Sequence, residues 1–474
     1  MHRVANENRP DVHLSGGVSS SQSWLQCLRG CGRRYSIYDV VCLCEDCGGL
    51  LDVEHDVAAL KEHAGADWKS LFDQRLRSVE QPYASGVWSK KEWVCPQLDP
   101  ANVVSLGEGN TPLLRARRLE QELGLARLWV KSCGNSHTGS FKDLGMTVLV
   151  TVVRQMIADG REIRAVVCAS TGDTSAALTA YCAAAGIPAV VLLPRGKVST
   201  AQLAQPIANG ALVLSLDTDF DGCMRLVQEL IRDPTLYLAN SMNPLRIEGQ
   251  KTIGIEVVQQ LSWDVPDWII IPAGNLGNVS ALGKGLMMMK ELNLIDRLPR
   301  IACAQVESAN PLYLSYQTGF QEYRPVQARP TLASAIRIGD PISYERAVKT
   351  LHHFDGVVEQ ASEHELATAA ARADRTGLYC CPQTGAALAI VSKLLRTGQI
   401  EPSHKVVVLS TAHGLKFTDF KVGYHEARLN DVEAMLANRP RELPPRFDAI
   451  TDAIDQTIDH PQPLPKQQHL DRAH

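Results

Sequence analysis

The sequence lacks the features that mark membrane-bound, secreted and nucleic-acid-binding proteins. The apolar run at 146–153 is far shorter than the roughly 18 to 20 residues that span a bilayer. The 48 basic and 52 acidic side chains nearly cancel, to a net charge of −4, which argues against a basic nucleic-acid surface or a polybasic membrane anchor. Residues 1–22 lack the apolar core of a secretory signal.

Cysteine use and the N-terminal residues bear on the compartment. Thirteen cysteines are an odd number in a chain of 474 residues, which favours a reducing compartment over a disulfide framework. The N-terminal residues include Arg3 and Arg9 but also Glu7 and Asp11, whereas transit peptides tend to lack acids. We therefore expect a cytoplasmic protein, with plastid import as the alternative.

Three compositional blocks divide the chain. Residues 1–100 hold closely spaced cysteines and four of the seven tryptophans, and are interpreted as an N-terminal extension. Residues 426–474 are charged and rich in proline, and we expect this tail to be partly disordered. In residues 101–425, helical periods alternate with short apolar runs. The runs of strand length are 165–168, 189–193, 212–216, 268–271 and 406–409.

This alternation predicts an α/β fold in which helices cover both faces of a parallel sheet. Leu149, Val152, Val153 and Met156 follow a helical period, which Gly160 ends. Ligands in such folds sit beyond the carboxyl ends of the strands. The polar and glycine-rich turns after the strands are therefore the candidates for chemistry.

The first such turn, 274–278, has the sequence Gly-Asn-Leu-Gly-Asn, follows the run 268–271 and precedes a helical stretch. Its glycines allow backbone N–H groups to converge, and the helix N-terminus adds a positive partial charge, so the turn suits a phosphate. It matches neither a Walker loop nor a Gly-x-Gly-x-x-Gly motif. An ordinary strand-to-helix turn is the alternative.

The second turn follows the run 165–168 and carries Ser170, Thr171, Asp173 and Thr174. Helix capping alone explains one of these groups, but the whole cluster suits an anion.

The third turn leads into a helix at Lys142, where a lysine is unfavourable for the helix dipole. A solvated lysine is the alternative, but a desolvated amine can form a Schiff base with a carbonyl. Two anion cradles and a lysine suggest pyridoxal 5′-phosphate, whose aldehyde needs an amine and whose phosphate needs a glycine-rich loop.

Three motifs resemble fold-type II pyridoxal-phosphate enzymes: Thr-Gly-Ser-Phe-Lys-Asp at 138–143, Ser-Thr-Gly-Asp-Thr-Ser at 170–175, and the turn at 274–278. Longer strings at 48–56, 86–93, 239–246 and 410–416 are similar to the plant-type branch of the threonine synthase family. The resemblance covers about residues 48–425. It implies an α/β, fold-type II enzyme with two parallel-sheet lobes, the smaller one (about 145–245) inserted in the larger, plus a zinc-ribbon-like N-terminal extension.

The resemblance also implies roles for single residues. Lys142 takes the Schiff-base position and moves protons, Thr384 faces the pyridine nitrogen, and Asp173 stands where many relatives carry Asn against the cofactor's O3′. Gln383 departs from the His of plant enzymes. The cofactor phosphate is expected at Gly274, Asn275, Leu276, Gly277 and Asn278.

The implied reaction converts O-phospho-L-homoserine and water into L-threonine and phosphate. The implied substrate contacts are Ser170, Thr171, Thr174, Asn240, Ser241 and Arg246. Arginine suits this role because its planar fork binds phosphate through two hydrogen bonds. A surface arginine at a helix start is the alternative interpretation of Arg246.

A site for the activator S-adenosylmethionine is expected, by the same resemblance, at Pro82, Tyr83, Ala84, Ser105, Pro112 and Leu113. Pro112 stands where activated plant forms are expected to carry Asn. Because proline has no N–H donor, the resemblance leaves activation open.

Cys27-x3-Cys31 and Cys44-x2-Cys47 have the look of a small zinc ribbon over about 24–52, with Cys42 as a spare thiol. Unliganded buried thiols are the alternative.

Two other functions compete with the implied one. The first is another fold-type II lyase or dehydratase acting on a phosphorylated or hydroxy amino acid. The second is a non-catalytic zinc-ribbon binding protein, which the presence of Lys142 disfavours. Members of the family are usually homodimers, and we expect the tryptophan-rich N-terminal block to supply interface area. No nucleic-acid or membrane partner is expected.

Overall fold

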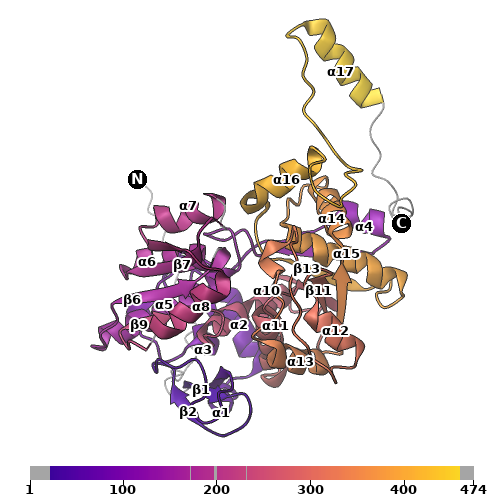
Figure 1. Cartoon of the computed structure of the whole chain (residues 1–474). Helices are drawn as coiled ribbons and strands as arrows, with labels where there is room; N and C mark the ends of the chain where they lie inside the picture. Colours follow the sequence, from indigo (N-terminus) through magenta and orange to yellow (C-terminus); the bar gives the residue numbers. More distant parts are fainter. Residues whose placement is uncertain (1–21, 171, 197–199, 231, 460–474) are drawn as a thin grey trace, which may run out of the picture.

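The structure is a computed structural model that describes residues 22–170, 172–196, 200–230 and 232–459 (Figure 1). Thr171, the leader at 1–21 and the last residues of the tail, 460–474, lie outside the described residues, together with the expectations placed on them. Among the helices described, none combines the length and the apolar character needed to cross a bilayer.

The N-terminal residues form a small antiparallel sheet in the order β2-β1-β3, drawn in indigo at the bottom of Figure 1. Its strands are β1 (Ser23–Cys27), β2 (Arg34–Ser36) and β3 (Leu51–His55). The short helices that follow are α1 (Val57–Leu60), α2 (Gly65–Arg75), η1 (Trp88–Lys90), α3 (Lys91–Val94) and η2 (Pro100–Asn102).

The larger of the two parallel sheets has the strand order β12-β11-β10-β13-β5-β4. Only β4, at one edge, runs antiparallel to its neighbour. The strands are β4 (Leu113–Arg115), β5 (Arg127–Ser132), β10 (Trp268–Pro272), β11 (Arg300–Val306), β12 (Val357–Ala361) and β13 (Lys405–Ser410). The helices of this lobe are α4 (Arg117–Leu123), α10 (Thr252–Gln260), α11 (Gly277–Glu291), α12 (Pro311–Gln317), η3 (Ser334–Ile336), α13 (Tyr344–His353), α14 (Glu363–Asp374), α15 (Pro382–Arg396), η4 (Gly414–Phe417) and α16 (Thr418–His425).

The smaller sheet is parallel throughout and has the order β8-β7-β6-β9. Its strands are β6 (Ala165–Ala169), β7 (Ala189–Pro194), β8 (Leu212–Leu216) and β9 (Leu236–Leu238), and its helices are α5 (Lys142–Ala158), α6 (Asp173–Ala185), α7 (Thr200–Ala208), α8 (Phe220–Leu230) and α9 (Leu245–Gln250). The chain leaves the larger sheet after β5 and returns at β10, so the two lobes lie side by side (Figure 1).

The strands predicted from apolar runs are confirmed, as is the helix that Gly160 ends. One detail differs: β8 is not buried on both faces, and Leu212 is 57% exposed. The physical reason is that β8 is an edge strand with a single neighbour.

The N-terminal tryptophans pack inside the chain. Trp68, Trp88 and Trp93 are fully buried, and the indole N–H of Trp88 donates to Thr147 on α5 at 2.7 Å. The Trp68 and Trp93 rings meet edge to face, with centroids 5.6 Å apart. The apolar area of these three side chains fills the core next to α5, and an interface supplied by the rest of the N-terminal block stays a prediction.

The C-terminal segment leaves the body and ends in α17 (Phe447–Asp459), which stands apart at the top of Figure 1. Phe447, Ile450, Ile454 and Ile458 on this helix are all exposed.

Candidate active site

Lys142 is held at the start of α5 by a polar loop. The carboxylate of Asp143 accepts hydrogen bonds from the Ser136 hydroxyl at 2.6 Å and from the Thr138 N–H at 2.8 Å. The Phe141 N–H donates to the Thr411 carbonyl at 3.0 Å, just beyond β13. These bonds fix the helix start between the two lobes, so the position of the lysine follows from the backbone as well as from its own side chain.

The Lys142 amine lies in a desolvated setting. It sits 4.4 Å from the centroid of the Phe141 ring, and no carboxylate within salt-bridge distance pairs with it among the described residues. Burial, together with the nearby Arg246 cation, lowers the pKa of Lys142 to about 7. A far larger share of this amine is therefore neutral near pH 7 than of an ordinary lysine, and the neutral amine is the form that attacks a carbonyl.

The loop 274–278 connects β10 to α11, as the sequence predicted. The Asn275 side chain donates to the Ser241 hydroxyl at 2.6 Å and accepts from the Ile342 N–H at 2.7 Å. Asn278 donates to the Pro272 carbonyl at 2.7 Å. Asn275 therefore ties the loop to two distant segments, and Asn278 ties it to the end of β10.

The start of α11 offers donors to an anion. Leu276 precedes the helix in a left-handed conformation with φ of 66° and provides no side-chain cap. The first N–H groups of the helix have no acceptor within it, and a helix N-terminus is positive. Gly274 packs closely, since a Cβ there would lie 2.9 Å from the Ile336 Cα. The arrangement fits the phosphate of pyridoxal phosphate.

Arg246 is a buried cation on α9 that lacks an acidic partner among the described residues. Its guanidinium donates to the Thr174 hydroxyl at 3.1 Å and to the Ala239 carbonyl at 3.3 Å, while its Nε–H has no acceptor. Burial lowers the pKa of Arg246 to about 10. A buried charge needs a counter-charge, so this position suits an anionic ligand.

Asp173 at the start of α6 forms an ion pair that the sequence analysis missed. Its carboxylate lies 2.8 Å from Lys416 Nζ, and the same amine donates to the Thr138 carbonyl at 2.9 Å. Lys416 follows β13, so its contact joins the two lobes. The only signal in the sequence was its place in the string at 410–416, where no role was assigned to it.

One cavity brings most of the predicted residues together. The predicted residues that line it are Lys142, Asp173, Ser241, Arg246, Gly274, Asn275, Leu276, Gly277 and Asn278. Gln383, noted in the sequence only as a departure, and Thr411, which was missed, also line it. Neither polar atom of the buried Gln383 amide has a hydrogen-bond partner among the residues that the structure describes.

Other predicted residues lie behind the cavity wall. The fully buried Thr384 donates to the Ser410 hydroxyl at 3.1 Å and does not line the cavity. Ser170 accepts from the Gly172 N–H at 3.3 Å, and Asn240 accepts from the Ala169 N–H at 3.1 Å. These residues shape the turns that carry Asp173 and Arg246.

The two segments of the expected effector site meet through their backbones. The Gly86 N–H donates to the Glu108 carbonyl at 2.7 Å. Tyr83 lies under the Arg75 guanidinium, 4.1 Å from the ring centroid, while Ser105 donates to Glu108 at 3.0 Å. Pro112 is exposed and Leu113 is half-buried.

Comparisons with known proteins agree with this geometry. A family profile described as "Pyridoxal-phosphate dependent enzyme" matches residues 104–412. The chain is 53% identical over 459 residues to threonine synthase 2, chloroplastic, of Arabidopsis thaliana, covering 96% of this chain and 87% of the relative. It is 38% identical over 395 residues to threonine synthase of Methanocaldococcus jannaschii, covering 83% and 93%.

A solved structure, threonine synthase from Escherichia coli, shares the fold. It aligns with a TM-score of 0.63 and 20% sequence identity, covering 92% of this chain and 100% of that chain. Fold, cavity and family profile together define a fold-type II pyridoxal-phosphate dependent enzyme, a lyase whose cofactor is pyridoxal phosphate. At this identity and coverage, the chain belongs to the threonine synthase family.

Proposed function

We propose that the cavity converts O-phospho-L-homoserine and water into L-threonine and inorganic phosphate. The observation that carries the proposal is the convergence of three groups on one cavity. These are the desolvated Lys142 amine, the N–H donors of the loop 274–278, and the Arg246 cation without an acidic partner.

Pyridoxal phosphate, when bound, supplies an aldehyde that joins an amine and a ring that withdraws electrons from the neighbouring carbons. The loop 274–278 would hold its phosphate, and Lys142 would provide the amine. Asp173 lines the same cavity, so we assign to it the cofactor's O3′ side. Thr384 would face the ring nitrogen, and Thr411 adds a further hydroxyl on the cavity wall.

In the overall reaction, the bond between Cγ and the phosphate oxygen breaks, Cβ loses one hydrogen and gains a C–O bond to water, and Cγ gains a proton to become a methyl group. The Lys142 amine would take a proton from Cα and return protons to the later carbons, because its lowered pKa suits both directions of transfer. Arg246 would hold the substrate phosphate, assisted by Ser241 on the cavity wall. Thr174 orients Arg246 through its hydrogen bond.

A dehydratase acting on serine or threonine is the competing candidate, and it is not favoured. Those substrates bring a single anionic group, the α-carboxylate, whereas O-phospho-L-homoserine also brings a phosphate, the second anion that the buried Arg246 suits.

Measuring phosphate release and keto-acid formation in parallel tests the proposal. The purified holoenzyme is given O-phospho-L-homoserine, O-phospho-L-serine, L-serine or L-threonine. We expect phosphate only from the first substrate and no keto acid from the others. Keto acid from serine or threonine would contradict the proposal.

Substitutions at Arg246 test whether this residue binds the substrate. Arg246→Ala should lower kcat/KM by about 100-fold, the value of one to two charge-assisted hydrogen bonds, and keep the cofactor's visible spectrum. Arg246→Lys retains the charge and should lose less. Loss of the bound cofactor in both variants would indicate that Arg246 binds the cofactor rather than the substrate.

Three further expectations remain proposals. The chain comprises an N-terminal extension (1–100), a catalytic body (101–425) whose smaller lobe spans about 145–245, and a tail (426–474). It forms a homodimer, which sedimentation velocity tests. It works in the cytoplasm, with the plastid as the alternative that the chloroplastic relative supports.

Activation by S-adenosylmethionine also remains a proposal. The predicted segments lie side by side, while the exposed Pro112 supplies no N–H donor. Assaying the enzyme with and without this compound decides the matter.

A further inference from the structure

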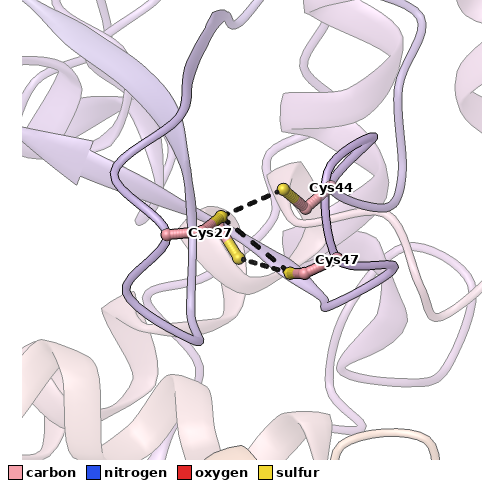
Figure 2. A group of neighbouring side chains, drawn as sticks. Cys27, Cys44 and Cys47 are labelled. Atoms are coloured by element: carbon pink, nitrogen blue, oxygen red, sulfur yellow. Dashed lines mark hydrogen bonds between the residues drawn. The ribbon is translucent and has the colours of Figure 1, made fainter.

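The four cysteines of the N-terminal sheet gather at one point, outside the active site. Their sulfur atoms all lie within 4.8 Å of one another. Individual Sγ–Sγ distances are 3.4 Å for Cys27 and Cys47, 3.2 Å for Cys31 and Cys44, and 3.9 Å for Cys31 and Cys47. Figure 2 shows Cys27 facing the loop that carries Cys44 and Cys47.

This geometry matches a tetrahedral zinc site. With zinc–sulfur bonds of about 2.3 Å, the ligands of a tetrahedral site lie about 3.8 Å apart. A disulfide needs sulfur atoms about 2.05 Å apart, and all four thiols are free. The sulfurs therefore have the spacing of metal ligands rather than of two cystines.

The two cysteine pairs, Cys27 with Cys31 and Cys44 with Cys47, are followed by similar backbone turns. Each pair ends in a cysteine followed by a glycine with positive φ, Gly32 at 78° and Gly48 at 65°. The Gly48 N–H donates to the Cys44 carbonyl at 2.8 Å, and the Tyr35 hydroxyl lies 3.6 Å from the Cys44 sulfur. These turns orient the thiols toward one another.

Basic side chains surround the cluster. Arg33 bridges the two cysteine loops through Asp46, at 2.5 Å, and Glu45. Arg29, between the first two cysteines, pairs with Glu345 on α13 at 2.8 Å. Because each arginine is already paired with acidic side chains, its main effect is to join the two cysteine loops and to tie the first loop to α13.

We infer that Cys27, Cys31, Cys44 and Cys47 bind one zinc ion, and that this ion holds strand β3 against the catalytic body. This inference is independent of the proposed reaction, because none of the four cysteines lines the active-site cavity. The buried apolar side chains of the small sheet, among them Leu25, Ile37 and Leu51, are few for a separate fold, and a bound metal would add to what they contribute.

Strand β3 is tied to the active-site helices by buried charges. His55 Nε2 lies 2.7 Å from Glu248 and 2.9 Å from Lys251, and Asp52 pairs with Lys284 on α11 at 2.9 Å. Glu248 also pairs with Lys284. Glu248 stands two residues after Arg246 on α9, so order in the zinc-bound sheet extends to the element that carries Arg246.

Metal analysis of the purified holoenzyme after extensive dialysis is the direct test. We expect about one zinc ion per chain, released when a mercurial reagent blocks the thiols and detected with a zinc indicator. Less than about 0.2 zinc per chain, iron in place of zinc, or a mass four units lower from two disulfides would each overturn the inference.

Cys42 provides a matched control, because it lies in the same segment but outside the group. Cys44→Ser should lose most of the zinc, whereas Cys42→Ser should keep it. Hydrogen exchange of the zinc-depleted protein should quicken in β1 to β3 and in α9, and stay unchanged in α14 and α15. Equal zinc in both variants, or an unchanged α9, would contradict the corresponding part of the inference. If Cys44→Ser does not fold, the zinc content of the wild-type protein and of Cys42→Ser decides the matter.

Discussion

At the scale of single residues, the active site depends on two cations without an acidic partner among the described residues and on one carboxylate that is paired across the lobes. Within the part of the chain that the structure describes, Lys142 lacks a paired carboxylate and Arg246 lacks an acidic partner, while Asp173 is paired with Lys416 across the lobes. Each arrangement leaves a charge or a lone pair available to a ligand. The chemistry therefore follows from which contacts each group makes and which it lacks.

The Lys142 amine should titrate far below an ordinary lysine. In the cofactor-free protein, we expect its labelling by an amine-reactive ester to rise with pH around a midpoint near 7, because burial favours the neutral amine. Other lysine peptides from the same digest serve as controls, with midpoints near the usual value of about 10.4. Peptide mapping by mass spectrometry reads each site. A Lys142 midpoint above about 9.5 would contradict the desolvated setting.

Asp173→Asn should lower the midpoint of the pH-dependent change in the cofactor's visible absorbance by about one pKa unit. The substitution removes a negative charge from the cavity and leaves the Lys416 cation, and both effects disfavour protonation nearby. Absorbance titration of the reconstituted variant and the wild type measures the shift. An identical midpoint in the two proteins would show that Asp173 lies too far from the titrating group to influence it.

The sequence predicts some of these residues but not others, for physical reasons. Lys142 and the loop 274–278 could be found because glycine-rich turns after strands leave a local pattern. The assignment of Thr384 to the ring nitrogen stays a prediction, whereas nothing in the sequence indicated that Thr411 lines the cavity. The Lys416–Asp173 pair joins positions more than 240 residues apart. Such contacts depend on how the two lobes meet, which no local pattern encodes.

At the scale of elements, the turn from β10 into α11 is the most constrained part of the site. Its two glycines differ in their surroundings: a Cβ at Gly274 would meet backbone at 2.9 Å, whereas a Cβ at Gly277 would meet only the Ser343 hydroxyl at 3.6 Å. The strand, the turn and the helix could all be predicted from the sequence. The tight contact with Ile336 could not, because that residue comes from a distant segment.

Gly274→Ala should reduce the free energy of unfolding of the cofactor-free protein by about 1 to 3 kcal/mol, as overpacking does. Gly277→Ala is the matched control and should change it by less than about 0.5 kcal/mol, since alanine favours a helix. Urea unfolding of both variants measures the difference. If Gly277→Ala folds normally but binds pyridoxal phosphate weakly, the helix start is the phosphate site. Equal stability of the two variants would contradict the packing argument.

At the scale of the whole molecule, the cavity exists because two sheets meet at the ends of their strands. The Gln205 side chain donates to the Thr138 carbonyl at 3.1 Å, and Lys416 Nζ donates to Gln205 at 3.1 Å while pairing with Asp173. Two lobes were implied by the resemblance of the sequence. The contacts that hold them together emerge only from the fold.

Lys416→Met should raise KM for the phosphorylated substrate about tenfold and leave the bound cofactor in place, because it removes a charge-assisted bond between the lobes. Lys393→Met is the control, since Lys393 has the same 17% side-chain exposure but pairs with Glu365 far from the cavity. Steady-state kinetics measure both variants. Similar KM values for Lys416→Met and the wild type would show that the contact does not contribute to substrate binding.

The most direct test of the account is to run the reaction in water enriched in oxygen-18 and to measure the masses of both products by mass spectrometry. Elimination followed by water addition breaks the C–O bond of O-phospho-L-homoserine. We therefore predict L-threonine with one heavy oxygen in its hydroxyl group, and phosphate that keeps its four original oxygens. Labelled phosphate together with unlabelled homoserine would mean simple hydrolysis of the phosphate ester, and would contradict the account.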